Sequence, residues 1–562
     1  MNNKLLEIKN LQISFKGEKG YNPVIHGINV ALNSNEILGI VGESGSGKSV
    51  SSLAIMGLLP KNTAKIDEGE IWFNGQNLLQ LNEEKFQKIR GAEIAMVFQE
   101  PMSSLNPSLK CGFQVGEILK IHTKKSAVEI KEEVIQLFEK VKLPNPKKIV
   151  NSYPHEISGG QKQRVMIAMA IACKPKLLIA DEPTTALDVT VQKEIILLLK
   201  ELQQETKMSI IFVSHDLALV SEIVQNVLVM YKGQIVEQGK TEEIFNDPKH
   251  DYTKALLASR PSLEVRLKRL PTIQDFIENN TNKSVITKQI RLSNHEKMYK
   301  NPPLLEVVDL SKEYTSNIGF FSKKEIFKAV DNASFKIFEG ETLGLVGESG
   351  CGKSTLGNAI LLLDKATSGQ IFYRGKSISN LSKKEEIELR KEIQIIFQDP
   401  YSSLNPRIPV GKAIMEPMKV HGLYQNDKER KEKTIEILKQ VGLGQEHFNR
   451  YPHEFSGGQR QRIGIARTIA IQPKLIVCDE SVSALDISVQ AQVLNLLNEL
   501  KENFGFTYLF ISHDLAVVKY ISDKVMVMNK GKIEEIEEAD ELYRNPKSEY
   551  TQKLINAIPK GN

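Results

Sequence analysis

The sequence predicts an α/β fold in two similar halves, each built around a mainly parallel β-sheet. Three observations support this prediction: apolar runs of strand length, helical segments between them, and an internal repeat. The apolar runs stand at 37–41, 177–180 and 210–213 in the first half and at 342–346, 475–478 and 508–511 in the second. Strands that are apolar on both faces favour a parallel sheet covered by helices on each side.

The repeat covers almost the whole chain of 562 residues. The difference in residue number between corresponding positions of the two halves falls from 305 to 298 along the chain. The corresponding pairs are Lys48 and Lys353, Gln99 and Gln398, Ser158 and Ser456, Asp181 and Asp479, and His215 and His513. So few changes of offset over so long a stretch indicate a duplication. We therefore expect one domain at 1–261 and a second at 304–562.

Residues 262–303 separate the two expected domains. The segment is polar and basic, contains Asn-Asn-Thr-Asn at 279–282, and ends at Pro302 and Pro303. This composition is typical of a flexible tether, which would keep the two halves at a high effective concentration. A basic strip that docks on an acidic lipid surface is the alternative.

Composition excludes several classes of protein. With 41% hydrophobic and 25% charged residues, the chain is typical of a globular protein. No apolar run approaches the ~18 to 20 residues of a membrane span, and no apolar block follows the N-terminus, so we expect a cytosolic chain. The four cysteines stand far apart, which argues against zinc ribbons, iron–sulfur sites and disulfide frameworks. Most of the net charge of +5 lies at 262–300, so charge indicates no nucleic-acid surface.

A glycine-rich loop follows the first apolar run of each half and matches the phosphate-binding pattern in full. Such glycines let the backbone wrap a polyphosphate, while the lysine reaches the terminal phosphates and the serine hydroxyl ligates magnesium. A chance glycine turn is the alternative, but two full copies argue against it. The candidate residues are Gly42, Ser44, Gly45, Gly47, Lys48, Ser49 and Val50, and Gly347, Ser349, Gly350, Gly352, Lys353, Ser354 and Thr355.

Two carboxylates end a buried strand of each half, Asp181 and Glu182 in the first and Asp479 and Glu480 in the second. The aspartate is suited to hold magnesium, and the glutamate can polarise the water that attacks a terminal phosphate. A helix N-cap is the alternative for paired acids. Their position behind a phosphate loop favours the catalytic interpretation.

Two further motifs recur in both halves. His215 and His513 follow the next strand, at the sheet edge where ligands gather, and an imidazole there can donate to the terminal phosphate or to the attacking water. Ser-Gly-Gly-Gln precedes a helical segment at 158–161 and 456–459, where the serine and the exposed N–H groups form a second anion-binding terminus.

Taken together, these motifs resemble the nucleotide-binding domains of ATP-binding-cassette (ABC) proteins, over all of the chain except the segment 262–303. The resemblance implies two P-loop NTPase domains that bind ATP and Mg²⁺ and hydrolyse the ATP. It also implies that each domain has an antiparallel β subdomain and a helical subdomain beside its parallel core.

The resemblance assigns further roles to individual residues. Residues 186–188 and 484–486 resemble the D-loops, and Phe15 and Tyr314 stand where the family places an aromatic ring under adenine. The switch histidines are His215 and His513. The signature residues are Ser158, Gly160, Gln161, Ser456, Gly458 and Gln459, and the metal ligands are Ser49, Gln99, Asp181, Ser354, Gln398 and Asp479, of which Gln99 and Gln398 also contact the nucleotide.

In that family two domains dock head to tail, with each ATP between the phosphate loop of one and the signature of the other. One site would join Lys48, Ser49, Asp181, Glu182 and His215 to Ser456 and Gly458, and the other would join Lys353, Ser354, Asp479, Glu480 and His513 to Ser158 and Gly160. Because both halves keep all of these residues, we expect two hydrolysis-competent sites. Ser481 and Ser483 replace Pro183 and Thr185 beside the glutamate, which sets the second site slightly apart.

Finer motifs resemble the ATPase subunits of bacterial peptide and nickel importers, fused in one chain as in glutathione and microcin C uptake systems. These motifs stand at 99–107, 153–161, 247–253, 398–406 and 451–459. The resemblance implies a peripheral protein on the cytoplasmic side of the inner membrane, two separate permease subunits and, indirectly, a periplasmic or lipid-anchored solute-binding protein. A soluble tandem cassette that acts on ribosomes or nucleic acid is the alternative, although we expect no nucleic-acid partner.

Overall fold

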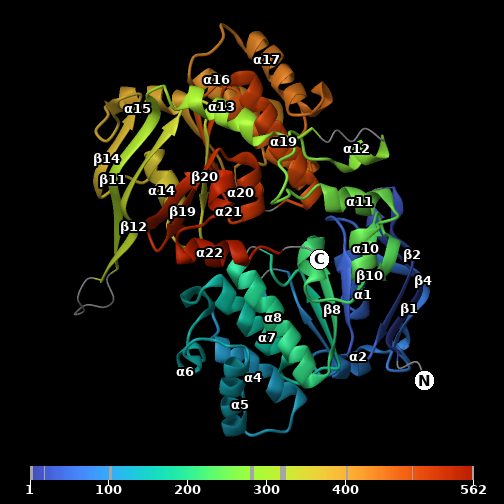
Figure 1. Ribbon diagram of the computed structural model, residues 1–562. Helices are drawn as coiled ribbons and strands as arrows, with labels where there is room; N and C mark the ends of the chain where they lie inside the picture. The colour runs from blue at the N-terminus through green and yellow to red at the C-terminus, as the bar shows by residue number, and fades with distance from the viewer. Residues whose placement is uncertain are drawn as a thin grey trace. The chain divides into compact units, whose positions relative to one another are not determined.

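The computed structural model describes residues 4–17, 19–99, 104–185, 187–278, 284–316, 325–399, 401, 403–483 and 485–559. The chain divides into two compact units (Figure 1). The first contains residues 1–187 and 191–257 together with 559–562, and the second contains 188–190 and 258–558. Each unit has one six-stranded and one four-stranded sheet.

The six-stranded sheet of the first half has the order β10-β9-β3-β8-β7-β6. Its strands are β3 (Ile37–Val41), β6 (Ile94–Val97), β7 (Leu177–Asp181), β8 (Ser209–Ser214), β9 (Asn226–Tyr231) and β10 (Gln234–Lys240). All neighbours are parallel except β9 and β10. Every residue of β3, β7 and β8 is buried, which explains why the apolar runs predicted these strands correctly.

An antiparallel sheet of order β2-β1-β4-β5 lies beside this core. Its strands are β1 (Lys4–Gly17), β2 (Gly20–Asn33), β4 (Ala64–Phe73) and β5 (Gln76–Asn77). The buried residues of β1 include Leu6, Ile8 and Ile13, which share one hydrophobic cluster with Leu38 and Ile40 of β3. The expected antiparallel β subdomain is therefore present and packs on the parallel core.

The helices of the first half cover the core and form a separate layer. They are α1 (Lys48–Ile55), α2 (Glu83–Ile89), α4 (Cys111–His122), α5 (Ala127–Lys140), α6 (Pro146–Ile149), α7 (Gly159–Ile171), α8 (Val189–Thr206), α9 (Leu217–Ser221), α10 (Thr241–Asn246) and α11 (Asp251–Ala258), with 3-10 turns at Leu78–Gln80 and Pro154–Glu156. Helices α4, α5 and α7 contact one another (Figure 1), which confirms the expected helical subdomain.

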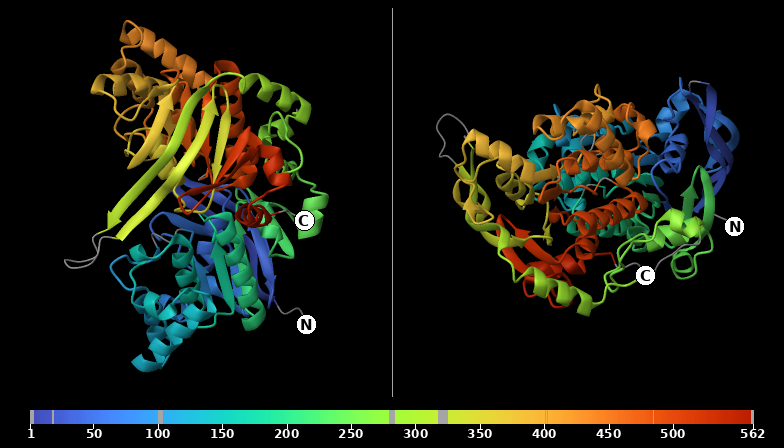
Figure 2. Two further views of the ribbon diagram at one scale, coloured as in Figure 1. Left: turned by 60° about the vertical axis from the view of Figure 1, so that its left-hand side comes forward. Right: turned by 90° about the horizontal axis from the view of Figure 1, so that it is seen from above.

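The second half repeats this architecture with sheets of order β16-β17-β18-β13-β19-β20 and β12-β11-β14-β15. The strands are β11 (Pro303–Ser316), β12 (Glu325–Phe338), β13 (Thr342–Val346), β14 (Ser368–Tyr373), β15 (Lys376–Ser377), β16 (Ile393–Ile396), β17 (Leu475–Asp479), β18 (Thr507–Ile511), β19 (Lys524–Asn529) and β20 (Lys532–Glu538). Figure 2 shows the long strands β11 and β12 side by side in yellow-green.

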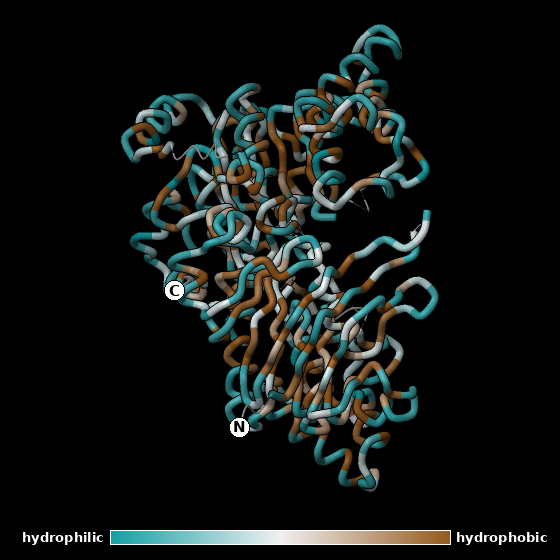
Figure 3. The backbone as a smooth tube through the Cα atoms, turned by 90° about the vertical axis from the view of Figure 1, so that its right-hand side faces the viewer, coloured by the Kyte–Doolittle hydropathy of each residue, from teal (hydrophilic) through white to brown (hydrophobic). Residues whose placement is uncertain are grey.

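The helices of the second half correspond to those of the first. They are α14 (Lys353–Ile360), α15 (Lys383–Glu392), α16 (Val410–Val420), α17 (Asp427–Gln440), α18 (Gly457–Ile469), α19 (Ile487–Phe504), α20 (Leu515–Ile521), α21 (Ala539–Arg544) and α22 (Glu549–Asn556), with 3-10 turns at Gln445–His447 and Pro452–Glu454. Figure 3 shows hydrophobic stretches along the interior strands and hydrophilic stretches at the loops, as expected for sheets buried under helices.

The segment expected to be a tether is folded onto the second half. It contains α12 (Ile273–Ile277) and α13 (Lys288–Met298), and its residues belong to the second unit. The segment therefore contains regular helices, which its tether-like composition did not predict. The buried residues of α13 are Arg291 and His295, so the face that packs is polar, and a search for apolar periodicity could not detect it.

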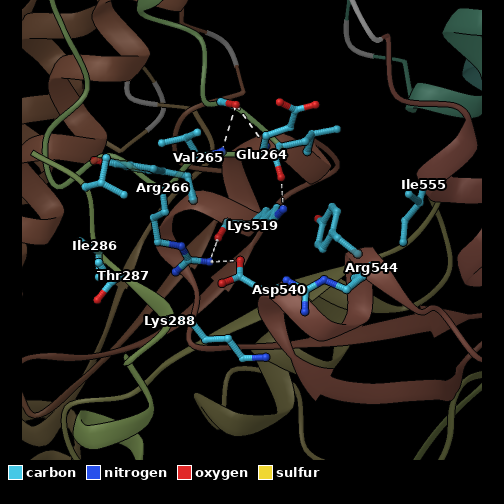
Figure 4. Close-up of a pocket in the computed structure, with 15 residues that line it drawn as sticks. Glu264, Val265, Arg266, Ile286, Thr287, Lys288, Lys519, Asp540, Arg544 and Ile555 are labelled. Carbon is cyan, nitrogen blue, oxygen red and sulfur yellow. Dashed lines mark hydrogen bonds and ion pairs between the residues drawn. The ribbon is translucent and has the colours of Figure 1, made fainter. Parts of the chain in front are cut away.

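Charge pairs hold this segment in place. Arg291 forms ion pairs with Glu538 and Asp540, and His295 Nε2 lies 3.1 Å from Asp523 Oδ1. Figure 4 shows Arg266 of the same segment pointing toward Asp540, from which it lies 3.5 Å away. Because these two arginines are neutralised by acids of the second half, they do not support the alternative of a basic strip that docks on lipid.

Within the described ranges, no helix is both long enough and apolar enough to cross a bilayer. The four cysteines are free, and three of them, Cys111, Cys351 and Cys478, are buried. The expectation that the chain has no disulfide framework agrees with these free thiols.

Candidate functional site

The glycine-rich loop of each half runs from the end of a central strand into a helix, as the sequence predicted. In the first half β3 leads to α1, and Lys48 is buried at the start of that helix. Its Nζ donates to the carbonyl oxygens of Gly42 at 2.7 Å and Glu43 at 2.9 Å. Lys353 makes the equivalent bonds at 2.8 and 3.0 Å. The loop carbonyls therefore fix the position of the lysine ammonium group in both halves.

The serine after each lysine lies near the aspartate that ends β7 in the first half and β17 in the second. Ser354 Oγ donates to Asp479 Oδ1 at 3.0 Å. Burial raises the pKa of Asp181 to about 6, and the charge of Glu182 adds to this effect. Burial likewise raises the pKa of Asp479. Asp181 Oδ1 has no hydrogen-bond partner among the described residues.

These donors suit a magnesium ion. A buried carboxylate oxygen without a partner, next to a serine hydroxyl, fits a cation that takes few protein ligands and completes its shell with phosphate and water. In the described part of the chain, no group of three or more His, Cys, Asp or Glu side chains is arranged to hold a metal ion by itself. The serine hydroxyl and the aspartate carboxylate could therefore contribute to a cation site together with other ligands.

Glu182 is the centre of a hydrogen-bond cluster. Its Oε2 accepts from Gln99 Nε2 at 3.0 Å and from Thr185 Oγ1 at 2.9 Å, and it lies 3.2 Å from His215 Nδ1. Burial acts to raise the pKa of Glu182, but the hydrogen bond and charge of His215, together with Lys48, lower this pKa to about 2. The carboxylate is therefore ionised at neutral pH and fixed in direction.

Glu480 is held in the same way in the second half. Its Oε2 accepts from Gln398 Nε2 at 2.9 Å and lies 3.4 Å from His513 Nδ1. Burial opposes ionisation, yet His513 and Lys353 lower the pKa of Glu480. Burial also acts against a charged His513, but the hydrogen bond and charge of Glu480 raise the pKa of that imidazole. The predicted glutamate and histidine thus meet in both halves.

The backbone at the two glutamates is strained. Glu182 has φ of 48° and Glu480 has φ of 46°, a region that non-glycine residues rarely adopt. The N–H group of each is held by the neighbouring strand, through Val213 O and Ile511 O, both at 2.9 Å. Such strain costs about 1–3 kcal/mol and persists mainly at functional sites. It turns each glutamate out of line with its strand, toward the glutamine and histidine.

The Ser-Gly-Gly-Gln motifs form helix N-termini, as predicted. Ser158 caps α7, its hydroxyl accepting from Gln161 N while Gln161 Oε1 accepts from Ser158 N. Ser456 and Gln459 cap α18 identically. A Cβ atom on Gly160 would lie 2.7 Å from Val191 Cγ1, so this position requires glycine for packing.

Comparison with known proteins identifies the family. The family model "ABC transporter" matches residues 25–185 and 330–483, and the model "Oligopeptide/dipeptide transporter, C-terminal region" matches 236–284 and 535–562. The chain belongs to the ABC transporter family. It contains two ABC cassettes and is an ATPase of that family.

Its relatives match along nearly their whole length. The glutathione import ATP-binding proteins of Salmonella choleraesuis and of Escherichia coli O6:H1 are 45% and 44% identical, over 99% of this chain and 89% of theirs. The protein of the same name from Pectobacterium atrosepticum is 43% identical, over 99% and 90%. Among solved structures, a dimeric ATP-binding cassette bound to ADP and Pi is 30% identical over 42% of this chain and 98% of its own, with a TM-score of 0.38.

Other predicted ABC residues lie apart from these clusters. Phe15 packs at the edge of the first-half core, whereas Tyr314 is 43% exposed and donates to Asp364 Oδ2 at 2.5 Å. Val50 also packs on the core. Ala186 and Ala484 of the predicted D-loops lie outside the described residues, as do residues 100–103, 400 and 402 of the predicted motifs at 99–107 and 398–406.

Sequence reasoning missed one difference between the two ABC sites. Thr185 Oγ1 donates to the carboxylate of Glu182, but Ser483 Oγ donates to the backbone oxygen of Glu480 at 2.8 Å. The replacement of Pro183 and Thr185 by serines marked this position, but only the structure shows that the second glutamate lacks the donor which the first one has.

Proposed function

We propose that the chain is the fused ATPase of an ABC importer for glutathione, peptides or similar solutes. The observation that supports this proposal most is the 45% identity to a glutathione import ATP-binding protein over 99% of the chain, which spans both cassettes and the segment between them. The C-terminal region of oligopeptide and dipeptide transporters, matched twice, points to the same solute class. The ribosome or nucleic-acid alternative has no comparable support.

In this proposal the chain works at the cytoplasmic side of the inner membrane, bound to two permease subunits that receive solute from a solute-binding protein. In this proposal the permease subunits form the path of the solute through the membrane. Each ATP would lie between the phosphate loop of one half and the signature of the other, as the resemblance to ABC proteins implies. ATP would then hold the halves together until its terminal phosphate is released.

The candidate residues have distinct tasks in hydrolysis. Three donors converge on Glu182 Oε2, so Oε1 is the oxygen available to orient and polarise the attacking water. Lys48 and the backbone N–H groups of its loop bind the phosphates, and His215 can donate to the terminal phosphate. Ser49, Asp181 and Gln99 would hold Mg²⁺, which supplies charge stabilisation to the phosphates.

The two sites should both be active but unequal. Glu480 lacks the hydroxyl donor that Thr185 gives to Glu182, because Ser483 donates to the backbone oxygen of Glu480 instead. A less restrained carboxylate orients water less well, so we expect the site of Glu480 to turn over more slowly.

Uptake assays in a strain that lacks this gene would test the solute class. Labelled glutathione, labelled oligopeptides and nickel should be supplied separately, with the wild-type gene and the Glu182→Gln/Glu480→Gln double variant as complementing copies. We expect glutathione or peptide uptake to depend on the wild-type copy. Normal uptake of all three solutes in the deletion strain, or salt-sensitive association of the chain with ribosomes, would contradict the proposal.

A further inference from the structure

In each half, a tyrosine near the C-terminal end of that half contacts the phosphate loop of the same half. Tyr252 lies in α11, next to α10 and β10 (Figure 1), and its hydroxyl oxygen accepts from the backbone N–H of Glu43 at 2.9 Å. Tyr550 in α22 accepts from the N–H of Glu348 at 3.2 Å. The contact spans about 200 residues of sequence in each half and recurs in register.

The tyrosine and the loop lysine hold one and the same peptide group. The carbonyl of Gly42 and the N–H of Glu43 belong to a single planar unit and point in opposite directions. Lys48 Nζ binds the carbonyl at 2.7 Å, while Tyr252 binds the N–H. In the second half Lys353 and Tyr550 hold the corresponding peptide group.

This peptide group needs such restraint because glycine precedes it. Gly42 has φ of 154°, and a Cβ atom there would lie 2.2 Å from Met230 O, so only glycine fits. Glycine also resists rotation of the following peptide plane least. If the plane turned, the carbonyl that positions Lys48 would point elsewhere. The tyrosine hydroxyl opposes that rotation.

In each half, the backbone just before the tyrosine is hydrogen-bonded to a strand of the same half. The carboxylate of Glu237 in β10 accepts from the N–H groups of Lys249 and His250, at 2.7 and 3.1 Å. In the second half, Glu535 in β20 accepts from the N–H groups of Lys547 and Ser548. These hydrogen bonds fix the backbone at the start of the tyrosine helix in both halves.

The first tyrosine is held more firmly than the second. Tyr252 is 3% exposed and stacks on Tyr231, the last residue of β9, with ring centroids 4.2 Å apart. Asn529 ends β19 at the corresponding position, and Tyr550 is only partly buried. The longer hydrogen bond of Tyr550 agrees with this looser packing.

We propose that Tyr252 and Tyr550 are positioning residues that lock the phosphate loops in the conformation that binds ATP. Both lie in the regions matched by the model of the oligopeptide/dipeptide transporter C-terminal region, so this tail would be a structural part of the nucleotide site. The inference rests on the proposed function in one respect, namely that the two glycine-rich loops hold ATP.

The test compares Tyr252→Phe, Tyr550→Phe and the double variant in the full chain. Loss of a hydrogen bond that orders the loop should weaken Mg·ATP binding in calorimetry by about fivefold in Tyr252→Phe, with a smaller effect in Tyr550→Phe. KM for ATP should rise while kcat at saturation stays the same, because the loop binds ground state and transition state alike. Hydrogen exchange of a peptide that covers residues 41–49 should accelerate in Tyr252→Phe.

Tyr231→Phe is the matched control, since it removes the same single oxygen from the ring stacked on Tyr252 and should leave Kd and exchange unchanged. Thermal melting verifies that each variant is folded. Lys48→Ala with Lys353→Ala tests the underlying assignment: if this pair leaves ATP binding intact, the loops do not hold ATP. If the lysine pair abolishes binding while the tyrosine double variant keeps Kd, KM and exchange within twofold of wild type, the positioning role is refuted.

Discussion

Replacing Arg291 by Met tests whether the segment 262–303 is a brace on the second cassette or a free tether. Arg291 is 5% exposed, and its guanidinium pairs with Glu538 and Asp540. Methionine keeps much of the length and removes the charge. If the segment were a tether, this change would not affect the stability of the cassette.

The magnitude follows from what remains buried after the substitution. Breaking a buried ion pair by removal of one partner costs about 3–5 kcal/mol. The side chains of Glu538 and Asp540 are 23% and 25% exposed, and Arg266 stays 3.5 Å from Asp540, so the two acids recover some solvation and pairing. We therefore take the lower end, about 3 kcal/mol, which lowers Tm of the second unit by roughly 6 °C.

Differential scanning fluorimetry of the full chain measures this shift, and limited proteolysis shows whether the segment detaches. Lys297→Met is the matched control, because it removes one positive charge from the exposed side of the same helix and should change Tm by less than about 1 °C. Equal melting of Arg291→Met and wild type, with unchanged protease sensitivity at 262–303, would refute the brace.

Three further predictions concern the ATP sites. Glu182→Gln and Glu480→Gln should each preserve ATP binding and suppress turnover, with the larger loss for Glu182→Gln, and unchanged turnover in the double variant would remove the catalytic assignment. Because burial raises the pKa of Asp181 to about 6, protons compete with Mg²⁺ for this carboxylate below that pH. We therefore expect the Mg²⁺-dependent affinity for ATP to fall by about tenfold per pH unit below pH 6. An affinity that does not change between pH 5 and 8 would contradict this prediction. Burial also raises the pKa of the Cys351 thiol, so N-ethylmaleimide at pH 7 should leave the ATPase rate intact, and an inhibition that Cys351→Ser abolishes would show the opposite.

Much of the fold was predictable because its central strands are buried on both faces and therefore read as uninterrupted apolar runs. The fold of the segment 262–303 could not be predicted, because α13 packs through Arg291 and His295 against acids more than 220 residues away in sequence. No local pattern distinguishes such a polar face from a solvent-exposed one. The contact of Thr185 with Glu182 could not be predicted for a related reason. A hydroxyl three residues along the chain can donate to the carboxylate or, as that of Ser483 does, to the backbone oxygen.

Contiguous motifs were sufficient to predict the duplication, the phosphate loops and the residues suited to catalysis, because the chemistry of phosphate binding demands particular side chains at short spacing. What emerged only from the folded chain is how those residues are held. Three features depend on residues brought together from distant positions. They are the strained backbone at Glu182, the contacts of Gln99 and His215 with one carboxylate oxygen, and the hydrogen bond of Tyr252 to the loop. Such contacts arise from packing, which no stretch of sequence specifies alone.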